Sequence, residues 1–375
     1  MIYNTFKDKK ISALGMGCMR FPTIDGDLTK IDEKKTAEMF DYAISHGVNY
    51  FDTAWGYHGG LSETVTGKLL AKYPRESYFL ADKFPGYDVS NMDKVEEIFE
   101  KQLQKTGVEY FDFYLFHNVC EKNIEEYLDE RFGIYDYLVK QKANGRIRHL
   151  GMSAHADLPV LDRFLKKYGD AIEFCQLQIN WLDWSFQKAK EKVELLRSYN
   201  IPVWVMEPVR GGRLARLAPE HEARLKTLRP DESVAAWSFR FLQTFSSPVV
   251  VLSGMSDFEQ VRENIQTYEE EKPLNAEEWT TLQGIVAEML GDLTPCTACR
   301  YCTEYCPQGL NIPELLELYN EHKFSNGGFI APMRIGNMPE DKRPSACLSC
   351  RACEAVCPQR IAISEAMSDF AKRLQ

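Results

Sequence analysis

The sequence contains no apolar run that approaches the roughly 20 residues needed for a membrane-spanning helix. Its first ten residues are polar and lack the apolar core of a secretion signal. It also lacks an excess of positive charge: the formal net charge is −10, which argues against a broad nucleic-acid-binding surface. We therefore expect a cytoplasmic protein with no membrane span and no nucleic-acid partner.

Two further absences concern the fold. No low-complexity segment interrupts the chain, and no Gly-x-Gly-x-x-Gly motif follows the first apparent strand. The composition, 44% hydrophobic and 27% charged, is ordinary for a globular protein and unlike that of a disordered one. With 375 residues, the chain has room for an α/β barrel of about 250 residues and a second, smaller domain.

Eight short runs rich in β-branched, aromatic or aliphatic residues alternate with amphipathic stretches. The expected strands are residues 11–18, 49–53, 78–83, 111–117, 148–153, 174–179, 202–206 and 248–252. The expected helices between them are residues 36–46, 95–105, 134–143, 158–168, 189–198 and 233–243. Eight such βα units predict a parallel (β/α)8 barrel over residues 1–290. A doubly wound open sheet shows the same alternation, but it usually has fewer strands.

The eleven cysteines are unevenly distributed, because eight of them lie between residues 296 and 357. They form the motif C-x2-C-x2-C-x3-C-P twice, with its cysteines at Cys296, Cys299, Cys302 and Cys306, and again at Cys347, Cys350, Cys353 and Cys357. This is the motif of bacterial ferredoxins, in which the fourth cysteine serves the other cluster. We therefore assign one [4Fe–4S] cluster to Cys296, Cys299, Cys302 and Cys357, and a second to Cys347, Cys350, Cys353 and Cys306. Zinc held by paired C-x2-C knuckles is the alternative, and three cysteines at successive x2 spacings fit it poorly.

Residues 291–375 are expected to form this iron–sulfur domain. Asn311 and Pro313 predict the start of one helix there, and Ser364 predicts the start of another. The domain resembles the α-helical dicluster ferredoxin domains of electron-transfer subunits more than a compact β-hairpin ferredoxin. The remaining cysteines are scattered, and we expect small buried side chains at Cys18, Cys120 and Cys175.

Four polar residues stand at or just beyond the ends of three consecutive expected strands: Asp52, Tyr57, Lys83 and His117. The carboxyl ends of barrel strands meet at the rim where barrel enzymes place their active sites, so these side chains could converge on one oxygen atom. A nearby ammonium favours the phenolate and so makes Tyr57 a better proton donor, while Asp52 can hold Lys83 in place. His117 can polarise a carbonyl group, whose carbon would then accept a hydride from a nicotinamide cofactor.

These four residues resemble the catalytic tetrad of the aldo/keto reductases, and the resemblance covers roughly residues 1–290. The family's Asp-Thr-Ala-x-x-Tyr motif is met by Asp52 to Tyr57, and its lysine and histidine fall on Lys83 and His117. The resemblance implies a barrel that uses NADP(H) or NAD(H) to reduce a small-molecule carbonyl or to oxidise an alcohol. It further implies that the cofactor is bound by Gly17, Cys18, Met19, Asp52, Ser153, Gln176, Met206, Gly254, Ser256, Gln260 and Asn264.

Three positions depart from the family pattern. Ala154 stands where the family has an asparagine that holds the carboxamide. Met206 stands where an aromatic residue often stacks on the nicotinamide, and a methionine covers a ring less rigidly. Gln260 replaces an arginine that binds the 2′-phosphate in some members, and Gly254 offers no charge. Arg262 is a weak substitute, so the choice between NADP and NAD stays open.

The combination of barrel and cysteine motifs resembles the ferredoxin-type aldo/keto reductases of bacteria and archaea. A nicotinamide exchanges two electrons as a hydride, whereas a [4Fe–4S] cluster normally passes one, and we find no flavin motif. In one interpretation the clusters carry electrons to or from a redox partner protein through an unseen mediator. In the other they stabilise a small domain that otherwise lacks a core and shape the substrate pocket in place of the family's C-terminal tail. The leading hypothesis is a carbonyl reductase. Trp55, His58 and Trp181 are candidates for lining its substrate pocket, although large aromatic residues at a barrel rim are as often part of the packing. The alternatives are an electron-transfer protein whose barrel is a docking scaffold with little turnover, and a redox or nicotinamide sensor.

Overall fold

The computed structural model describes residues 1–245 and 248–375, which form two compact units. The first unit is Met1–Gln283 and the second is Gly284–Gln375, so the division falls inside helix α12 (Ala276–Leu290). Among the described residues, no helix combines the length and the apolar character needed to cross a membrane.

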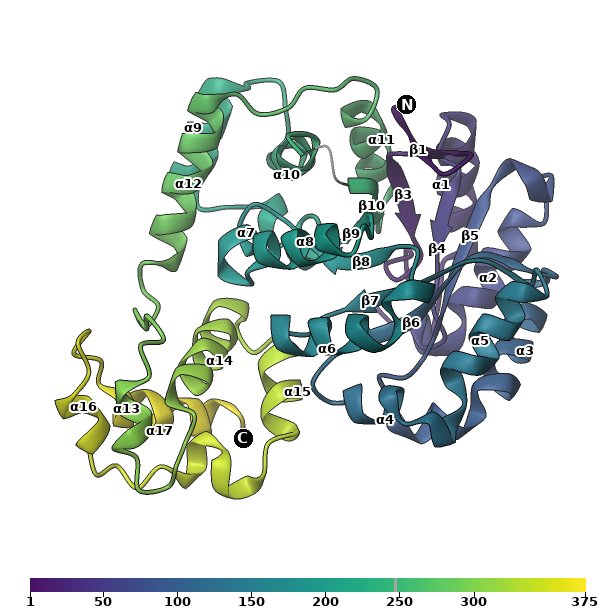
Figure 1. Cartoon of the computed structure of the whole chain (residues 1–375). Coiled ribbons are helices and arrows are strands. Elements are labelled where there is room, and N and C mark those ends of the chain that lie inside the picture. The colour runs from purple at the N-terminus through teal and green to yellow at the C-terminus, as the bar shows by residue number, and fades with distance from the viewer. Residues whose placement is uncertain (246–247) are drawn as a thin grey trace. The chain divides into compact units, whose positions relative to one another are not determined.

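Eight strands form a closed barrel in the first unit (Figure 1). In chain order they are β3 (Leu14–Gly17), β4 (Tyr50–Asp52), β5 (Phe79–Phe84), β6 (Phe111–Val119), β7 (Ile147–Ala154), β8 (Cys175–Gln178), β9 (Val203–Met206) and β10 (Pro248–Gly254). Every neighbouring pair is parallel, and β10 closes the barrel by pairing with β3. The predicted (β/α)8 barrel is therefore confirmed, and each expected strand segment overlaps one barrel strand.

The first expected strand, residues 11–18, is divided in the structure. Its beginning belongs to an antiparallel hairpin of β1 (Tyr3–Phe6) and β2 (Lys9–Ser12), and only β3 enters the barrel. Phe6 of the hairpin packs edge-on against Trp204, with 5.0 Å between ring centroids, and joins a buried cluster that includes Phe113. Because Phe113 and Trp204 lie near the beginnings of their strands, the hairpin covers the amino-terminal end of the barrel.

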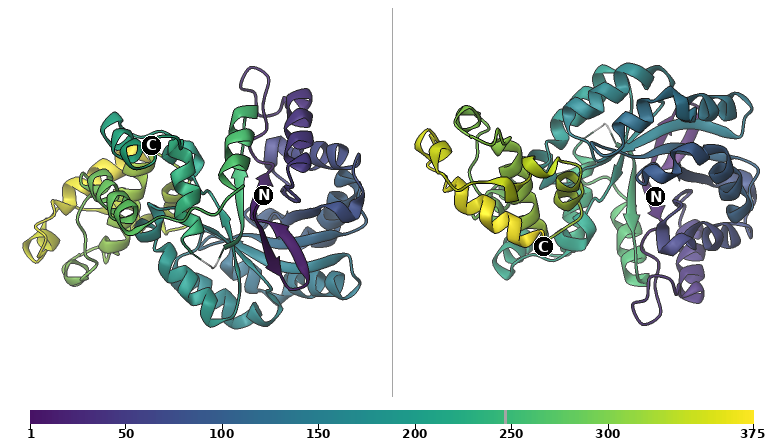
Figure 2. Two further views of the ribbon diagram at one scale, coloured as in Figure 1. Left: turned by 90° about the horizontal axis from the view of Figure 1, so that it is seen from above. Right: turned by 90° about the horizontal axis from the view of Figure 1, so that it is seen from below.

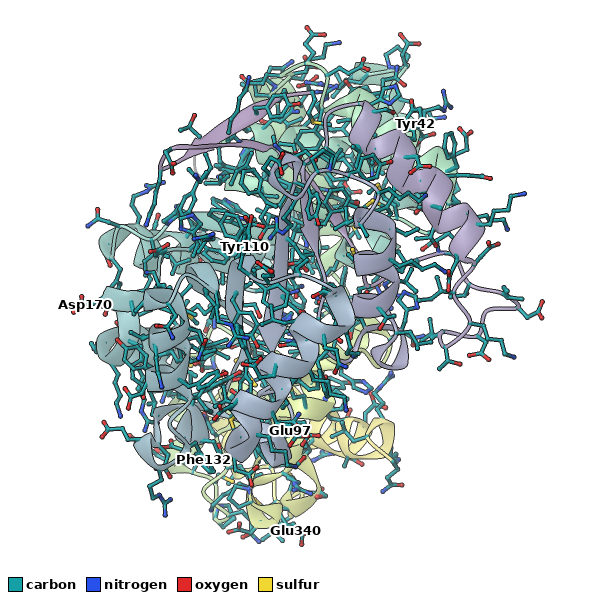
Figure 3. The ribbon with its side chains drawn as sticks, turned by 90° about the vertical axis from the view of Figure 1, so that its right-hand side faces the viewer. Tyr42, Glu97, Tyr110, Phe132, Asp170 and Glu340 are labelled. Carbon is teal, nitrogen blue, oxygen red and sulfur yellow. The ribbon has the colours of Figure 1, made fainter. Side chains whose placement is uncertain are left out.

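Helices surround the strands of the first unit (Figure 2). They are α1 (Glu33–Ser45), α2 (Ser62–Leu70), α3 (Val95–Thr106), α4 (Ile124–Leu128), α5 (Ile134–Ala143), α6 (Leu158–Tyr168), α7 (Asp183–Phe186), α8 (Ala189–Ser198), α9 (Pro219–Leu228), α10 (Val234–Gln243) and α11 (Phe258–Thr267). The six expected helices correspond to α1, α3, α5, α6, α8 and α10. Several begin at a side chain that accepts a backbone N–H of the first turn, as Asp32, Asp157 and Ser233 do. Their outer faces carry exposed charged residues such as Glu97 (Figure 3).

The second unit is helical, as expected. After the end of α12 it contains α13 (Tyr301–Glu304), α14 (Ile312–Ser325), α15 (Ile330–Gly336), α16 (Ala352–Ala355) and α17 (Ile363–Arg373). Asn311 precedes the first turn of α14, where Pro313 lies, as predicted. The prediction for Ser364 is wrong, because α17 begins one residue earlier and the Ser364 hydroxyl binds the Glu354 carboxylate at 2.5 Å.

This unit also has a hydrophobic core of its own. Leu315 and Leu316 of α14 and Met367 and Phe370 of α17 are almost completely buried in one cluster. Other buried members of the same cluster include Cys302 and Cys353. The premise that this small domain lacks a core is therefore wrong, although each motif supplies a cysteine to that core.

Candidate active site and iron–sulfur site

The four predicted catalytic residues meet at the carboxyl end of the barrel. Asp52 is the last residue of β4, Lys83 lies near the end of β5, His117 lies near the end of β6, and Tyr57 begins the 3-10 turn that follows β4. The Lys83 ammonium donates to Asp52 Oδ1 at 2.5 Å and to the Thr53 carbonyl at 2.7 Å. Its Nζ lies 5.0 Å from the centroid of the Tyr57 ring, and that ring lies edge-on to His117 with 6.0 Å between centroids.

Burial controls the charges of this group. The side chains of Lys83 and Asp52 are only 1% and 5% exposed. Burial by itself lowers the pKa of Lys83, but the Asp52 carboxylate outweighs it, so the lysine stays charged. Burial raises the pKa of the Tyr57 phenol, and this outweighs the lowering by Lys83. Lys83 thus lowers the pKa of Tyr57 as expected, but the net shift of that pKa is upward. The phenol therefore carries its proton at neutral pH.

His117 is held in its neutral form. Burial is the main cause, and the charge on Lys83 adds to it, so that the pKa of His117 is well below its usual range. Its Nδ1 atom is buried and has no hydrogen-bond partner among the described residues. A neutral imidazole can donate one hydrogen bond, which is what polarising a carbonyl oxygen requires.

A buried polar cluster that sequence reasoning missed lies behind Lys83. Gln102 of α3 donates through Nε2 to Asp82 Oδ1 at 2.9 Å, to Glu63 Oε1 at 2.9 Å and to the Lys83 carbonyl at 3.0 Å. The Lys83 N–H donates to Asp82 Oδ1 at 2.8 Å, and Tyr114 donates to Gln102 Oε1 at 2.6 Å. The backbone of Lys83 is therefore held on both sides. Burial and the Glu63 carboxylate raise the pKa of Asp82 well above its usual range.

Three aromatic residues near the strand ends are candidates for lining the substrate pocket. His58 lines an open cleft, where two contacts hold its ring: Nε2 accepts the Phe21 N–H at 3.0 Å and Nδ1 lies 2.9 Å from the Leu28 carbonyl. Trp181 is 1% exposed and donates to Ser238 Oγ at 3.0 Å, so it belongs to the packing. Trp55 lies under the Lys105 ammonium, which is 4.5 Å from its ring.

A tyrosine missed by sequence reasoning takes a place at the site. Tyr87 lies beyond the end of β5, and its ring is edge-on to His117 with 5.2 Å between centroids. Its hydroxyl comes so near Gly56 that a Cβ there would lie 2.3 Å from it. Burial, reinforced by Tyr57, raises the pKa of Tyr87 to about 12. Nothing in the local sequence distinguished this tyrosine, because its proximity depends on the path of the chain after Phe84.

The residues expected to hold the nicotinamide lie around Asp52. Gln176 is 3% exposed and donates through Nε2 to Asp52 Oδ2 at 3.3 Å. The Cys18 N–H donates to the Asp52 carbonyl at 2.8 Å, and the Cys18 side chain is fully buried. Ser153 is buried at the end of β7, and its hydroxyl accepts the Asn118 N–H at 2.8 Å.

The other expected cofactor residues lie at the ends of β3, β9 and β10. Gly17 pairs with Gly254, and a Cβ on Gly17 would be 3.3 Å from the Ser253 carbonyl oxygen. Met19 follows β3 and is half exposed, whereas Met206 ends β9. The Asn264 amide is already bound to Ser253 Oγ at 3.1 Å.

The residues after Gly254 lead into α11, which begins at Phe258. The Ser256 N–H donates to Gln260 Oε1 at 2.8 Å, and Gln260 Nε2 donates to Asp257 Oδ2 at 2.8 Å. Asp257 caps α11 by accepting the Gln260 N–H at 2.9 Å, and the Gln260 side chain is occupied by Ser256 and Asp257. Arg262 is paired with Glu259 at 2.6 Å.

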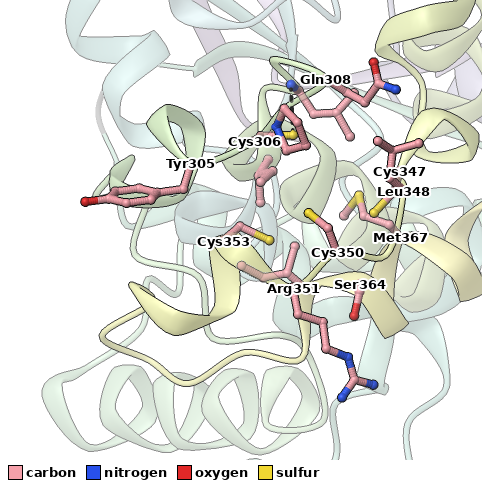
Figure 4. A pocket seen from close by; sticks show the side chains of 14 residues that line it. Tyr305, Cys306, Gln308, Cys347, Leu348, Cys350, Arg351, Cys353, Ser364 and Met367 are labelled. Atoms are coloured by element: carbon pink, nitrogen blue, oxygen red, sulfur yellow. Dashed lines mark hydrogen bonds between the residues drawn. The ribbon is translucent and has the colours of Figure 1, made fainter.

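The eight motif cysteines form two groups within the second unit. One cavity is lined by Cys306, Cys347, Cys350 and Cys353 (Figure 4). A second cavity is lined by Cys296, Cys299, Cys302 and Cys357. In each group three thiols come from one motif and the fourth comes from the other, which is the grouping inferred from the ferredoxin motif. Four thiols around one enclosed space fit the four corners of a cubane cluster.

The two motifs also share their backbone conformation. Ala298 and Arg300 in the first motif adopt positive φ values of 54° and 67°, and Ser349 and Arg351 in the second adopt 54° and 59°. These conformations turn the chain sharply between successive cysteines. The Ala298 N–H points to Cys296 Sγ at 3.4 Å, a contact that suits a thiolate.

Comparison with known proteins agrees with both sites. Residues 13–287 match the model of the aldo/keto reductase family, and residues 295–362 match that of a 4Fe-4S dicluster domain. The uncharacterized oxidoreductase YqkF of Bacillus subtilis is 26% identical over 69% of this chain and 88% of its own. The NADH-specific methylglyoxal reductase of Escherichia coli is 24% identical over 69% of this chain and 90% of its own.

Solved structures give the same answer for the barrel. The holo form of the aldo-keto reductase AKR11C1 from Bacillus halodurans superposes with a TM-score of 0.59 at 26% identity, and covers 76% of this chain and 96% of its own. An aldo/keto reductase from Klebsiella pneumoniae in complex with NADP and acetate superposes with a TM-score of 0.61 and, at 19% identity, supports the fold alone. The chain therefore belongs to the aldo/keto reductase family and carries a 4Fe-4S dicluster domain after its barrel.

Proposed function

We propose that this oxidoreductase uses NADPH or NADH to reduce a small-molecule carbonyl, or the oxidised cofactor to oxidise the alcohol, with Tyr57 as the general acid and base. The observation that carries the proposal is the arrangement of the Lys83–Asp52 ion pair beside the Tyr57 ring, with the neutral His117 at its edge. A nicotinamide bound at the rim would supply the hydride.

The chain's own residues supply the proton and the orientation. Tyr57 keeps its proton until negative charge develops on a substrate oxygen, and the Lys83 ammonium stabilises the phenolate that remains. His117 donates its single hydrogen bond to the same oxygen. Asp52 and the Thr53 carbonyl fix the ammonium in place, so it does not reorganise during the reaction. Positioned proton transfer of this kind is typically worth about 10²–10⁴ in rate.

The residues around Asp52 fit a nicotinamide carboxamide. Gln176 and Ser153 are buried polar side chains on neighbouring strands, which pair through Ser153 and Gln176 themselves. Their hydroxyl and amide groups match the donor and acceptor atoms of a carboxamide. Ala154 contributes no polar group.

Turnover of the reconstituted protein tests the proposal. Under anaerobic conditions, oxidation of NADPH or NADH in the presence of small aldehydes and ketones is expected for the full chain without a ferredoxin. Tyr57→Phe is expected to reduce kcat by about 10²–10⁴ while the cofactor still binds. Tyr73→Phe is the matched control, since Tyr73 binds Asp41 on the outside of the barrel. Full activity of Tyr57→Phe would contradict the proposal.

We further propose that the cysteines hold two [4Fe–4S] clusters with crossed ligation, as the two cavities support. Replacement of Cys302 or Cys357 by alanine is then expected to remove one cluster, and replacement of Cys306 or Cys353 to remove the other. Each variant should lose about half of roughly eight irons. Cys175→Ala, in a barrel strand, is the control. If Cys302→Ala and Cys357→Ala affected different clusters, the crossed assignment would be wrong.

The role of the clusters is a separate proposal. Because the second unit has its own helical core, we infer that the clusters carry single electrons to or from a redox partner protein, in the cytoplasm, in addition to stabilising the unit; exchange with the nicotinamide would require a mediator that converts a hydride into single electrons. The second candidate function is an electron-transfer protein with little turnover at the barrel. The two cavities lined by cysteines favour this candidate. Nicotinamide oxidation that requires an added one-electron acceptor, and that survives Tyr57→Phe, would favour this candidate.

A further inference from the structure

The end of β10 has no free positive charge of its own with which to bind a nucleotide phosphate. Gly254 has no side chain, and Gln260 is occupied by Ser256 and Asp257. Arg262 is held by Glu259. A dinucleotide carries at least the two negative charges of its diphosphate, so a cation from another part of the chain would favour its binding at this place.

Arg20, which follows β3, lies directly over Gly254. A Cβ built on Gly254 would be 2.8 Å from Arg20 Cγ and 3.1 Å from Arg20 Cβ. Gly254 does not have a positive φ, so the contact with Arg20, and not the backbone, is what excludes a side chain there. The absence of a side chain at the end of β10 therefore makes room for an arginine from the neighbouring strand.

The guanidinium of Arg20 reaches toward the turn that follows β9. Its Nη2 atom is 3.9 Å from the position of a Cβ on Gly211. Gly211 and Gly212 have φ values of 64° and 96°, a backbone conformation that favours glycine. Two side-chain-free positions, Gly211 and Gly254, thus lie on either side of one arginine, and they leave the backbone open to close approach by a ligand.

Arg20 also borders an open space and has no acidic partner. It is exposed, and no carboxylate lies within 4.0 Å of its guanidinium in the part of the chain that the structure describes. With Phe21, Ser256 and Phe258 it lines an open cleft of about 860 Å³. This volume lies within the range of small-molecule sites, about 300–1,000 Å³.

We propose that Arg20 is the side chain that binds a phosphate of the dinucleotide, because β10 has no cation at its end and Arg262 of α11 is paired with Glu259. The inference rests on the proposed function, in that it requires the barrel to bind NADPH or NADH. The planar guanidinium presents paired N–H donors that match two phosphate oxygens, and it keeps its charge at any physiological pH. The phosphate is either the diphosphate common to both cofactors or the 2′-phosphate of NADPH.

Nucleotide binding by the full, cluster-containing chain tests the assignment without relying on turnover. Dissociation constants for NADPH and NADH are measured anaerobically by calorimetry for the wild type, for Arg20→Leu and for Arg262→Leu. Arg20→Leu is expected to weaken binding about ten- to a hundredfold, the usual loss for a hydrogen bond to a charged group. Arg262→Leu is the matched control, because its charge is already paired with Glu259, and it should bind as the wild type does.

The two cofactors distinguish the two phosphates. An equal loss for NADPH and NADH assigns Arg20 to the diphosphate, and a loss confined to NADPH assigns it to the 2′-phosphate. Unchanged binding of both cofactors by Arg20→Leu overturns the inference and leaves the proposed function standing. A wild-type chain that binds neither cofactor overturns the proposed function itself.

A second variant tests the location of the charge. Arg20→Ala removes Arg20 Cγ, the nearest atom to a Cβ on Gly254, and leaves Arg20 Cβ at 3.1 Å, so Gly254→Lys can be added if the chain shifts by a few tenths of an ångström. The double variant Arg20→Ala/Gly254→Lys is expected to regain at least part of the affinity lost by Arg20→Ala alone. Failure of this rescue in a folded double variant would show that the effect of Arg20 does not arise from a charge at the end of β10.

Discussion

Replacing Lys83 by methionine should destabilise the barrel far more than the loss of one hydrogen bond would suggest. Methionine keeps most of the aliphatic stem but leaves the Asp52 carboxylate buried and 5% exposed, with Gln176 as its remaining side-chain partner at 3.3 Å. Removal of one member of a buried ion pair typically costs about 3–5 kcal/mol. Asp52→Asn/Lys83→Met removes both charges, so this double variant should recover much of that loss.

The loss of stability in Lys83→Met should also depend on pH. Burial raises the pKa of Asp52, and in Lys83→Met nothing positive opposes the rise. A carboxyl group whose pKa is higher in the folded state than in the unfolded state favours folding when protonated. The deficit of Lys83→Met is therefore largest at high pH and shrinks as the pH falls toward the raised pKa of Asp52.

Tryptophan fluorescence during urea unfolding is a suitable measurement, because all six tryptophans lie in the first unit. Lys9→Met is the control, since Lys9 is 42% exposed and its pair with Asp8 lies at the surface, where it should contribute nothing measurable. A Lys83→Met chain as stable as the wild type at pH 8, or a double variant less stable than the single one, would refute this reasoning.

Two further predictions concern residues outside the tetrad. Glu173 is partly buried, which raises its pKa, but His149, Lys142 and Lys7 outweigh this and hold the pKa at about 2. Because the folded-state pKa of Glu173 is depressed, its contribution to stability is present above the unfolded-state pKa of about 4.3 and is lost as the pH falls toward 2. The free energies of unfolding of the wild type and of Glu173→Gln should therefore converge over that range. A constant difference between them would contradict this prediction. Gln102→Leu should leave the buried oxygens of Asp82, Glu63 and the Lys83 carbonyl without the Gln102 amide donor. The free energy of unfolding in urea should fall by about 2–4 kcal/mol. The pH dependence of kcat should also change, because Lys83 loses a positioning contact. Unchanged pH dependence in a destabilised Gln102→Leu chain would limit Gln102 to a structural role.

The features that sequence alone could reveal are those in which local spacing dictates geometry. The cysteine motifs were readable because three thiols at x2 spacings converge within one turn of chain, whatever surrounds them. The barrel was readable because its strands are short apolar runs that alternate with amphipathic helices. Asp52, Lys83 and His117 could be grouped without coordinates because parallel strands in a barrel all end at the same rim.

Tertiary structure decided the features that depend on which distant side chains meet. The hairpin that covers the barrel floor, the Gln102 cluster behind Lys83 and the place of Tyr87 beside His117 join segments with no local pattern in common. Ser364 resembled a helix cap, but the hydroxyl was taken by Glu354. Arg20 was not among the residues expected to bind the cofactor, and Gly254 was noted only for its lack of charge. Packing of β3 against β10 places that arginine over that glycine, and such a contact is fixed by the closure of the barrel and not by either stretch of sequence.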